Sequence, residues 1–140
     1  GAIDSAVKQG AKVLIGGNVA GKTLQPTLMG SVTASMDVCR AEMFAPIAVV
    51  ESYTDFRDAV ARLNASRYGL QAGVFTNRMS DIWHAYATIE CGGIVINDIP
   101  TYRADNQPYG GMKESGMGRE GVRYAIEDMT EVKFLSINNR

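Results

Sequence analysis

The chain has 140 residues, enough to bury one hydrophobic core and too few for two full domains. Its 46% hydrophobic and 21% charged residues argue against a disordered chain or a fibrous repeat. The 14 basic and 15 acidic residues give a formal net charge of -1, which predicts no nucleic-acid partner and no attraction to an anionic membrane.

The sequence predicts a cytoplasmic protein without a metal site. Polar residues or glycine interrupt every apolar run before the roughly 20 residues that a membrane helix needs. The first residues lack a charged leader followed by an apolar segment, so no secretion signal is predicted. Cys39 and Cys91 lack metal-ligand spacing and fit free thiols in a reducing compartment. His84, the only histidine, has no ligand-type residues at metal-binding spacing.

The first predicted elements are a helix and a group of short strands. Ile3, Ala6 and Val7 recur at helical spacing from the start, which indicates a chain opened within an element. Residues 12–15 and 24–32 are expected to be short strands around a glycine-rich turn.

Strands and helices then alternate. Strands are expected at residues 45–53, 70–76 and 92–97, and helices at residues 55–63 and 80–89. The inner face of the second helix is predicted to carry Trp83, Tyr86 and Ala87. Strands joined through helices of this length are parallel neighbours, so we expect an α/β fold with these three strands in one mostly parallel sheet covered by helices.

The last part of the chain is predicted to hold a functional loop and an unpaired strand. Residues 98–118 form a long loop, and loops of that length are usually functional. A short helix is expected at residues 122–127. Apolar and polar residues alternate over 131–137, which predicts a strand that needs a partner edge.

Two phosphate-binding patterns occur, and their context argues against both. Residues 16–23 match the P-loop pattern, but Pro26 stands where the required helix should begin, so a hairpin turn is favoured. Residues 116–121 match the dinucleotide pattern, but no buried strand precedes them. We interpret them as a loop whose glycines allow positive φ or close approach.

Five segments in order resemble the aldehyde dehydrogenase superfamily, and the likeness extends over nearly the whole chain. They are residues 25–28 (QPTL), 42–46 (EMFAP), 68–76 (YGLQAGVFT), 93–97 (GIVIN) and 108–120 (PYGGMKESGMGRE), followed by the closing MTEVK of residues 129–133. The resemblance implies oxidation of an aldehyde to its acid through a cysteine thiohemiacetal, with hydride transfer to NAD or NADP.

The resemblance also implies residues for the cofactor. Glu42 matches the glutamate that holds the nicotinamide ribose hydroxyls, because a carboxylate accepts from two vicinal hydroxyls. Phe44 matches the aromatic residue beside that ribose, and Leu70 the apolar residue that limits the nicotinamide position. Ala45 departs from the family's usual glycine, which leaves the backbone less free there. No cofactor is expected to bind tightly to this chain alone.

The family's nucleophile and general base are expected upstream of this chain. Neither Cys39 nor Cys91 stands in the Gly-x-Cys context of the nucleophile, so the chain alone is predicted to be inactive. Glu120 matches a glutamate that the family assigns to water and proton traffic. The alternative is that Glu120 only supplies an N-terminal helix charge.

The loop after residues 96–97 borders the aldehyde entrance in the family. Arg103 resembles members that act on phosphorylated or otherwise anionic aldehydes, because guanidinium matches phosphate and carboxylate oxygens. The alternative for Arg103 is an internal pair with Asp105. Tyr102 and Tyr109 are expected to line the substrate pocket.

The sequence therefore predicts the C-terminal part of an aldehyde dehydrogenase catalytic domain at residues 1–130 and an oligomerisation strand at 131–140. Homo-oligomerisation follows from that strand. One alternative is a stand-alone, non-catalytic interaction module, and the other is a P-loop nucleotide hydrolase.

Overall fold

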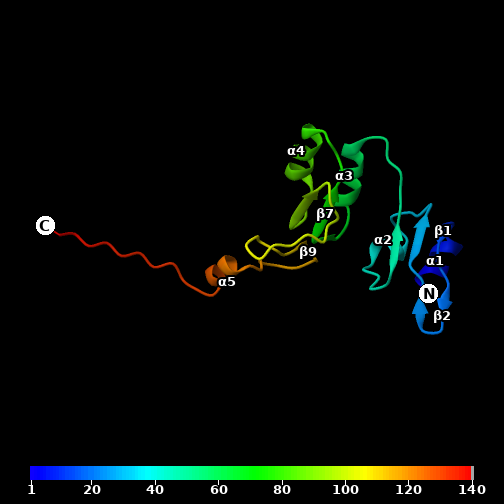
Figure 1. The fold of residues 1–140 in the computed structure, drawn as a ribbon, viewed down its shortest axis with the longest axis horizontal. Helices are drawn as coiled ribbons and strands as arrows, with labels where there is room; N and C mark the ends of the chain where they lie inside the picture. The colour runs from blue at the N-terminus through cyan, green and yellow to red at the C-terminus, as the bar shows by residue number, and fades with distance from the viewer. Residues whose placement is uncertain (140) are drawn as a thin grey trace. The chain divides into compact units, whose positions relative to one another are not determined.

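The structure is a computed structural model that describes residues 1–139 (Figure 1). Helices and strands alternate along the chain, and contacts divide it into one compact unit from Gly1 to Asp55 and a second that starts at Phe56. Each unit has its own core.

The first unit is built on a three-stranded sheet. The strands β1 (Lys12–Ile15), β4 (Thr27–Gly30) and β5 (Ile47–Val49) lie in the order β1-β4-β5, with β1 antiparallel and β5 parallel to the central β4. The helices α1 (Ala2–Lys8) and α2 (Asp37–Arg40) contact each other. The buried core of the unit consists of Ala6, Ala11, Met29, Met36 and Val38.

A β-hairpin occupies the apparent P-loop. The strands β2 (Val19–Ala20) and β3 (Thr23–Leu24) pair antiparallel across a turn at Gly21 and Lys22. Gly21 has a φ of 63°, a conformation that glycine adopts without steric cost. Thr23 begins the strand β3 and not a helix, so the preference for a turn over a phosphate-binding loop is confirmed.

The second unit has a parallel strand pair backed by helices. The strands β7 (Gln71–Val74) and β8 (Gly93–Ile96) pair in parallel, and α4 (Met79–Thr88) connects them along the chain. The helix α3 (Phe56–Asn64) contacts α4. The buried core consists of Val60, Ala72, Val74, Ala85, Ile89 and Cys91.

The prediction of one sheet for all three strands is wrong. The strand predicted at residues 45–53 is shorter, as β5, and it pairs with β4 in the first unit. Among the described residues, β7 and β8 pair only with each other. Register with β4 is set by contacts 20 residues apart in sequence, from Thr27 to Ile47, and strand–helix alternation does not reveal such pairing.

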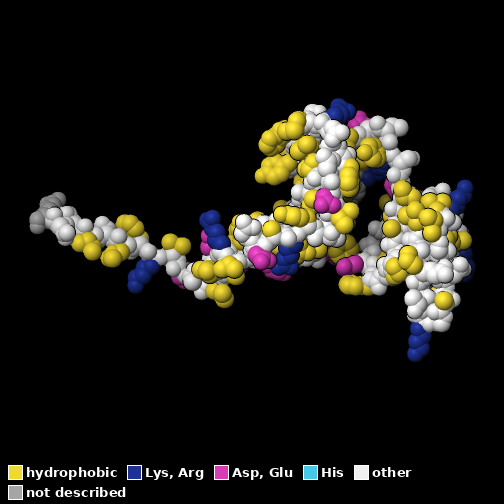
Figure 2. Space-filling model, in the orientation of Figure 1, with side chains coloured by type: hydrophobic (Ala, Val, Ile, Leu, Met, Phe, Trp, Pro, Cys, Tyr) yellow, Lys and Arg dark blue, Asp and Glu magenta, His cyan; other side chains and the backbone are white. Residues whose placement is uncertain are grey.

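The predicted inner face of α4 is also wrong. Ala85 is fully buried, whereas Trp83 is 62% and Tyr86 71% exposed. The two rings meet edge to face on the surface, with centroids 6.1 Å apart. The small Ala85 allows close packing against the sheet, so the large rings on the adjacent face are left in solvent. Figure 2 shows hydrophobic side chains gathered on this outer surface of α4.

The long loop carries structure of its own. Its strand β9 (Met112–Lys113) pairs with β6 (Tyr68–Gly69), and the helix α5 (Val122–Asp128) follows as predicted. Residues 131–139 form no strand within the described chain, and their apolar side chains are exposed (Figure 2), namely Val132, Phe134, Leu135 and Ile137. The tail strand therefore stays a prediction that needs a partner. Among the described residues, no helix is long and apolar enough to cross a membrane.

Candidate functional site

Three of the predicted site residues lie together in the second unit. The Arg103 Nη2 donates to Glu120 Oε2 over 2.6 Å, and the Arg103 guanidinium lies 4.4 Å from the centroid of the Tyr109 ring. The alternative pairing of Arg103 with Asp105 does not occur. The cluster is open to solvent, since the Arg103 and Glu120 side chains are 53% and 64% exposed.

The backbone brings this cluster together. Tyr109 and Glu120 form an antiparallel bridge, in which Tyr109 N donates to Glu120 O over 3.1 Å and Glu120 N donates to Tyr109 O over 2.6 Å. The segment between them turns back through positive-φ glycines, among them Gly116 and Gly118, as the loop interpretation of residues 116–121 predicted. Arg119 Nη1 ties the turn further by donating to the Gly111 and Gly118 carbonyl oxygens.

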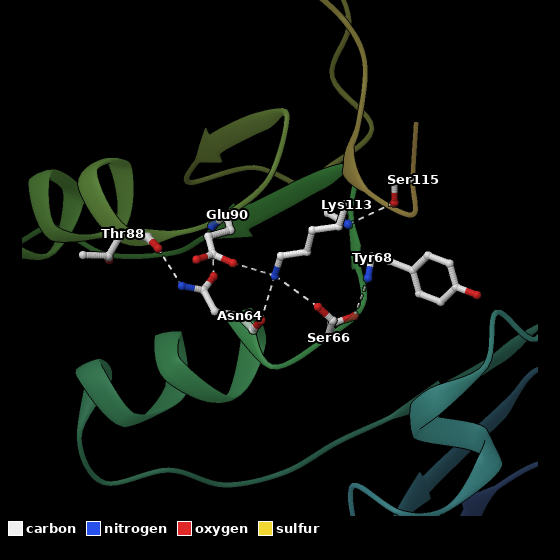
Figure 3. Close-up of polar contacts among 8 residues, drawn as sticks. Asn64, Ser66, Tyr68, Thr88, Glu90, Lys113 and Ser115 are labelled. Carbon is white, nitrogen blue, oxygen red and sulfur yellow. Dashed lines mark hydrogen bonds and ion pairs between the residues drawn. The ribbon is translucent and has the colours of Figure 1, made fainter. Parts of the chain in front are cut away.

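A lysine fixes the other side of the same loop (Figure 3). Lys113 Nζ lies 2.8 Å from Glu90 Oε2 and donates to the carbonyl oxygens of Asn64 and Ser66 over 2.7 and 3.1 Å. These carbonyls lie at and just beyond the C-terminus of α3, where a cation is favourable. Ser115 Oγ accepts from Gly69 N over 2.9 Å. We call the contacts of Lys113 with Glu90, Asn64 and Ser66 the Lys113 clasp.

Asn64 extends the clasp into the helix–strand connection. Its amide Nδ2 donates to Thr88 O over 2.6 Å, and its Oδ1 accepts from Glu90 N over 2.9 Å. Both ends of the Asn64 side chain are therefore engaged, and the Lys113 clasp joins α3, the end of α4 and β9 (Figure 3).

A cavity of about 740 Å³ opens beside the cluster within the second unit. It lies against β8 and is bordered by the loop from Tyr102 to Met112. Gln71 Nε2 donates to the Tyr102 carbonyl oxygen over 3.1 Å, so the Gln71 side chain holds the backbone of the loop at Tyr102. Tyr102 lines the cavity, whereas Arg103, Tyr109 and Glu120 are not among its lining residues.

The residues matched to the cofactor fall in both units. Glu42 and Phe44 belong to the first unit, where Phe44 is 92% exposed and adopts a φ of 33°. Positive φ in a bulky residue is strained and is typical of functional positions. Ala45 does not share this conformation, so its departure from glycine carries no backbone penalty here. Leu70 lies in the second unit, between β6 and β7, and is 41% exposed.

Both cysteines have a raised thiol pKa. Burial raises the pKa of Cys39, with a smaller contribution from the charge of Glu51, and burial raises the pKa of Cys91. Cys91 Sγ also donates to Gly93 O over 3.0 Å, so its proton is engaged within the core. A higher pKa lowers the thiolate fraction at neutral pH, which agrees with the interpretation of both as free, unreactive thiols.

The described residues offer no cluster of metal ligands. His84 lies on α4 and meets the ring of Phe56 edge to face at 6.1 Å, which gives the histidine a packing role.

The sequence model of the aldehyde dehydrogenase family matches residues 1–135. The chain belongs to the aldehyde dehydrogenase family. It is 43% identical over 136 residues to a 3-sulfolactaldehyde dehydrogenase of Priestia aryabhattai and 41% identical over 137 residues to a lactaldehyde dehydrogenase of Methanococcus maripaludis, and these matches cover 97% and 98% of this chain. The chain spans 28% and 29% of the length of these two relatives.

Solved aldehyde dehydrogenases share the fold as well. Aldehyde dehydrogenase 21 of Physcomitrella patens, determined with the reaction product succinate, is 42% identical and superimposes with a TM-score of 0.89 over 93% of this chain and 27% of its own. The glyceraldehyde-3-phosphate dehydrogenase of Methanocaldococcus jannaschii, determined with NADP, is 37% identical with a TM-score of 0.84 over 94% of this chain and 28% of its own. The chain thus forms part of an aldehyde dehydrogenase fold.

Two structural residues of this aldehyde dehydrogenase chain were not singled out from the sequence. Lys113 lies within the motif of residues 108–120, and nothing in that motif points to its acceptors, which lie up to 49 residues away in sequence. Gly92 lies where a Cβ would overlap the carbonyl oxygen of Gly110, so the loop can approach β8 only at glycine. The Gly-Gly pair before a strand was the available signal for such a close approach.

Proposed function

We propose that this chain is the C-terminal part of a longer NAD(P)-dependent aldehyde dehydrogenase that oxidises an anionic aldehyde to its acid. The chain spans only 28% of the 3-sulfolactaldehyde dehydrogenase and 27% of aldehyde dehydrogenase 21, which supports this view. We further propose that the chain alone is inactive, because neither cysteine is set up as a nucleophile and both have raised pKa values. The alternative of a stand-alone interaction module finds no support in the family match.

The position of Arg103 is the observation that supports an anionic substrate. Its guanidinium is stacked on Tyr109 and already binds a carboxylate, that of Glu120. A guanidinium held in this way presents planar donors to carboxylate, sulfonate or phosphate oxygens. Relatives named for 3-sulfolactaldehyde, aspartate semialdehyde and glyceraldehyde 3-phosphate support this substrate class, whereas others are named for lactaldehyde, which is neutral. We assign Tyr102 and Tyr109 to the borders of the same substrate site.

The cofactor assignment rests on the chemistry of two exposed residues. Glu42 offers a solvent-accessible carboxylate for ribose hydroxyls, and the exposed ring of Phe44, two residues later, offers an apolar surface beside it. From the family resemblance we assign Leu70 as the apolar residue that limits the position of the nicotinamide ring in the longer enzyme. When bound, the cofactor accepts the hydride of the aldehyde. The residues of this chain bind and orient it.

Residues 131–140 would complete the oligomer in this proposal. The backbone of residues 132–137 would pair as a strand with a second copy of the enzyme, which would cover the apolar side chains that are exposed here.

Substitution of Arg103 by methionine in the longer enzyme tests the substrate class. We expect the ratio of kcat/KM for succinate semialdehyde to that for butanal to fall about tenfold or more, because a charge-assisted hydrogen bond is lost. Arg123→Met is the matched control, because Arg123 also pairs with a glutamate, Glu127, but lies on α5. An unchanged ratio in Arg103→Met would refute the proposed substrate class.

A further inference from the structure

The guanidinium of Arg103 is bound by another side chain of the same protein. Glu120 Oε2 lies 2.6 Å from Nη2, and Glu120 is the only hydrogen-bond partner of the Arg103 side chain among the described residues. The single bond uses one donor of a group that has five. A carboxylate of the chain therefore binds where an anionic substrate would bind.

Arg103 has a second contact that does not involve Glu120. The Tyr109 ring lies under the guanidinium at 4.4 Å and holds its plane by a cation–π contact. Both partners of the Arg103–Glu120 pair are more than half exposed, and ion pairs in water are weak and exchange readily. A substrate anion can displace the Glu120 carboxylate without dismantling the site.

Glu120 also cannot move far from Arg103. Its backbone is fixed on both sides by the bridge to Tyr109, so its carboxylate stays at high effective concentration beside the guanidinium. Glu120 can therefore compete reversibly, within the chain, with an external anion for Arg103.

We propose that Glu120 is a specificity-determining residue, which occupies Arg103 as a stand-in for the substrate anion and is displaced by it. This inference rests on the proposed function, in which Arg103 selects anionic aldehydes. Weak anions present in the cell must compete with a tethered carboxylate. An aldehyde that also makes contacts elsewhere in the site displaces Glu120.

The size of the effect follows from the strength of an exposed ion pair. The ion pair divides Arg103 between a form bound to Glu120 and a form free to bind an anion. Removal of the Glu120 charge should therefore strengthen anion binding by roughly two- to sixfold. The effect should appear for anionic ligands only, because a neutral aldehyde does not use the guanidinium.

Glu120→Gln in the longer enzyme is the test. Glutamine keeps the length of the side chain and leaves the backbone bridge in place, but it lacks the charge. We expect the kcat/KM ratio of succinate semialdehyde to butanal to rise roughly two- to sixfold, mainly through KM. Inorganic sulfate, as an inhibitor competing with the anionic aldehyde, should show an inhibition constant lowered by a similar factor. Glu127→Gln, which breaks the matched Arg123–Glu127 pair, should leave both quantities at their original values.

Three other outcomes would overturn the inference. A fall in the ratio would mean that Glu120 holds Arg103 in its working position. Equal losses of kcat for both aldehydes, with the ratio unchanged, would assign Glu120 to proton or water traffic instead. An unchanged ratio together with an unchanged inhibition constant for sulfate would show that the pair does not compete with substrate. Arg103→Met separates these results from a failure of the proposed function, since only that failure leaves its ratio unchanged.

Discussion

Tyr109 and Glu120 face each other across an antiparallel bridge made of two backbone hydrogen bonds. This bridge closes the loop that contains the PYGGMKESGMGRE motif. It also brings the Glu120 carboxylate to Arg103, 17 residues earlier in the chain. The loop therefore presents a charged cluster on a fixed backbone, and its supports can be tested separately from its chemistry.

The Lys113 clasp should stabilise the fold of the second unit. The Lys113 side chain is 24% exposed and reaches three oxygen acceptors, so Lys113→Met leaves Glu90 and two carbonyls without their cation. We expect a loss of about 1–3 kcal/mol in the free energy of unfolding, measured by urea denaturation. Lys133→Met in the exposed tail is the control. Equal stabilities of the two variants would show that the clasp contributes nothing.

Gly92 should be intolerant of a side chain. A Cβ at Gly92 would overlap the Gly110 carbonyl oxygen, whereas a Cβ at the neighbouring Gly93 would meet only the flexible Gln71 side chain at 3.4 Å. Gly92→Ala should cost about 2 kcal/mol or more of unfolding free energy, because the loop must move away from β8. Gly93→Ala should cost clearly less. Similar losses at the two positions would contradict the close approach of the loop.

The buried thiol of Cys91 should make stability depend on pH in the alkaline range. Burial raises the pKa of Cys91 in the folded state, so the folded chain binds this proton more tightly than the unfolded chain does. The contribution is complete below the ordinary thiol pKa of about 8.5 and is lost as the pH rises through the folded value. The difference in unfolding free energy between the original chain and Cys91→Ala should therefore shrink at alkaline pH. A constant difference up to the highest pH at which the chain folds would count against burial of the thiol.

Trp83 reports on the exposed face of α4. It is the only tryptophan, and its side chain is 62% exposed beside that of Tyr86. In the 140-residue chain we expect emission close to that of a solvated indole and strong quenching by acrylamide. Exposed aromatic patches usually mark contact surfaces, so in the longer enzyme the same residue should be shielded. Equal quenching in both proteins would show that this face stays in solvent.

The tail should control association. Residues 131–139 carry exposed apolar side chains and make no strand within the chain, so we expect the 140-residue chain to associate and the chain without residues 131–140 to elute as a monomer. Size-exclusion chromatography with light scattering measures this directly. Elution of both at monomer mass would remove the tail from the interface.

Local patterns predicted the longer helices, whereas the short helix α2 and the short strands β6 and β9 were not predicted. The helical spacing of Phe56, Val60 and Leu63 marked α3, and the residues after Gly121 marked α5. Such signals depend on neighbours three or four positions apart, which the sequence displays directly. The same argument failed for Trp83 and Tyr86, because size alone does not decide which apolar face packs when a small Ala85 allows a closer approach.

Non-local pairing was the part that the sequence did not reveal. β5 was placed in the wrong sheet because it pairs with β4 in the first unit, whereas β7 and β8, which follow it along the chain, belong to the second. Arg103 was compared with Asp105, two positions away, whereas its partner Glu120 reaches it through a backbone bridge. The family resemblance had already selected Arg103, Tyr109 and Glu120 as site residues, and the structure adds their mutual contact.

Aldehyde-dependent formation of reduced nicotinamide is the measurement that decides whether this chain needs the rest of a longer enzyme. The assay compares the purified 140-residue chain with the longer enzyme, using NAD and NADP and both neutral and anionic aldehydes. We expect no turnover by the chain alone and turnover by the longer enzyme, fastest with the anionic aldehyde. Turnover by the 140-residue chain that is lost in Cys39→Ser or Cys91→Ser would contradict it, because one of these thiols would then be the nucleophile.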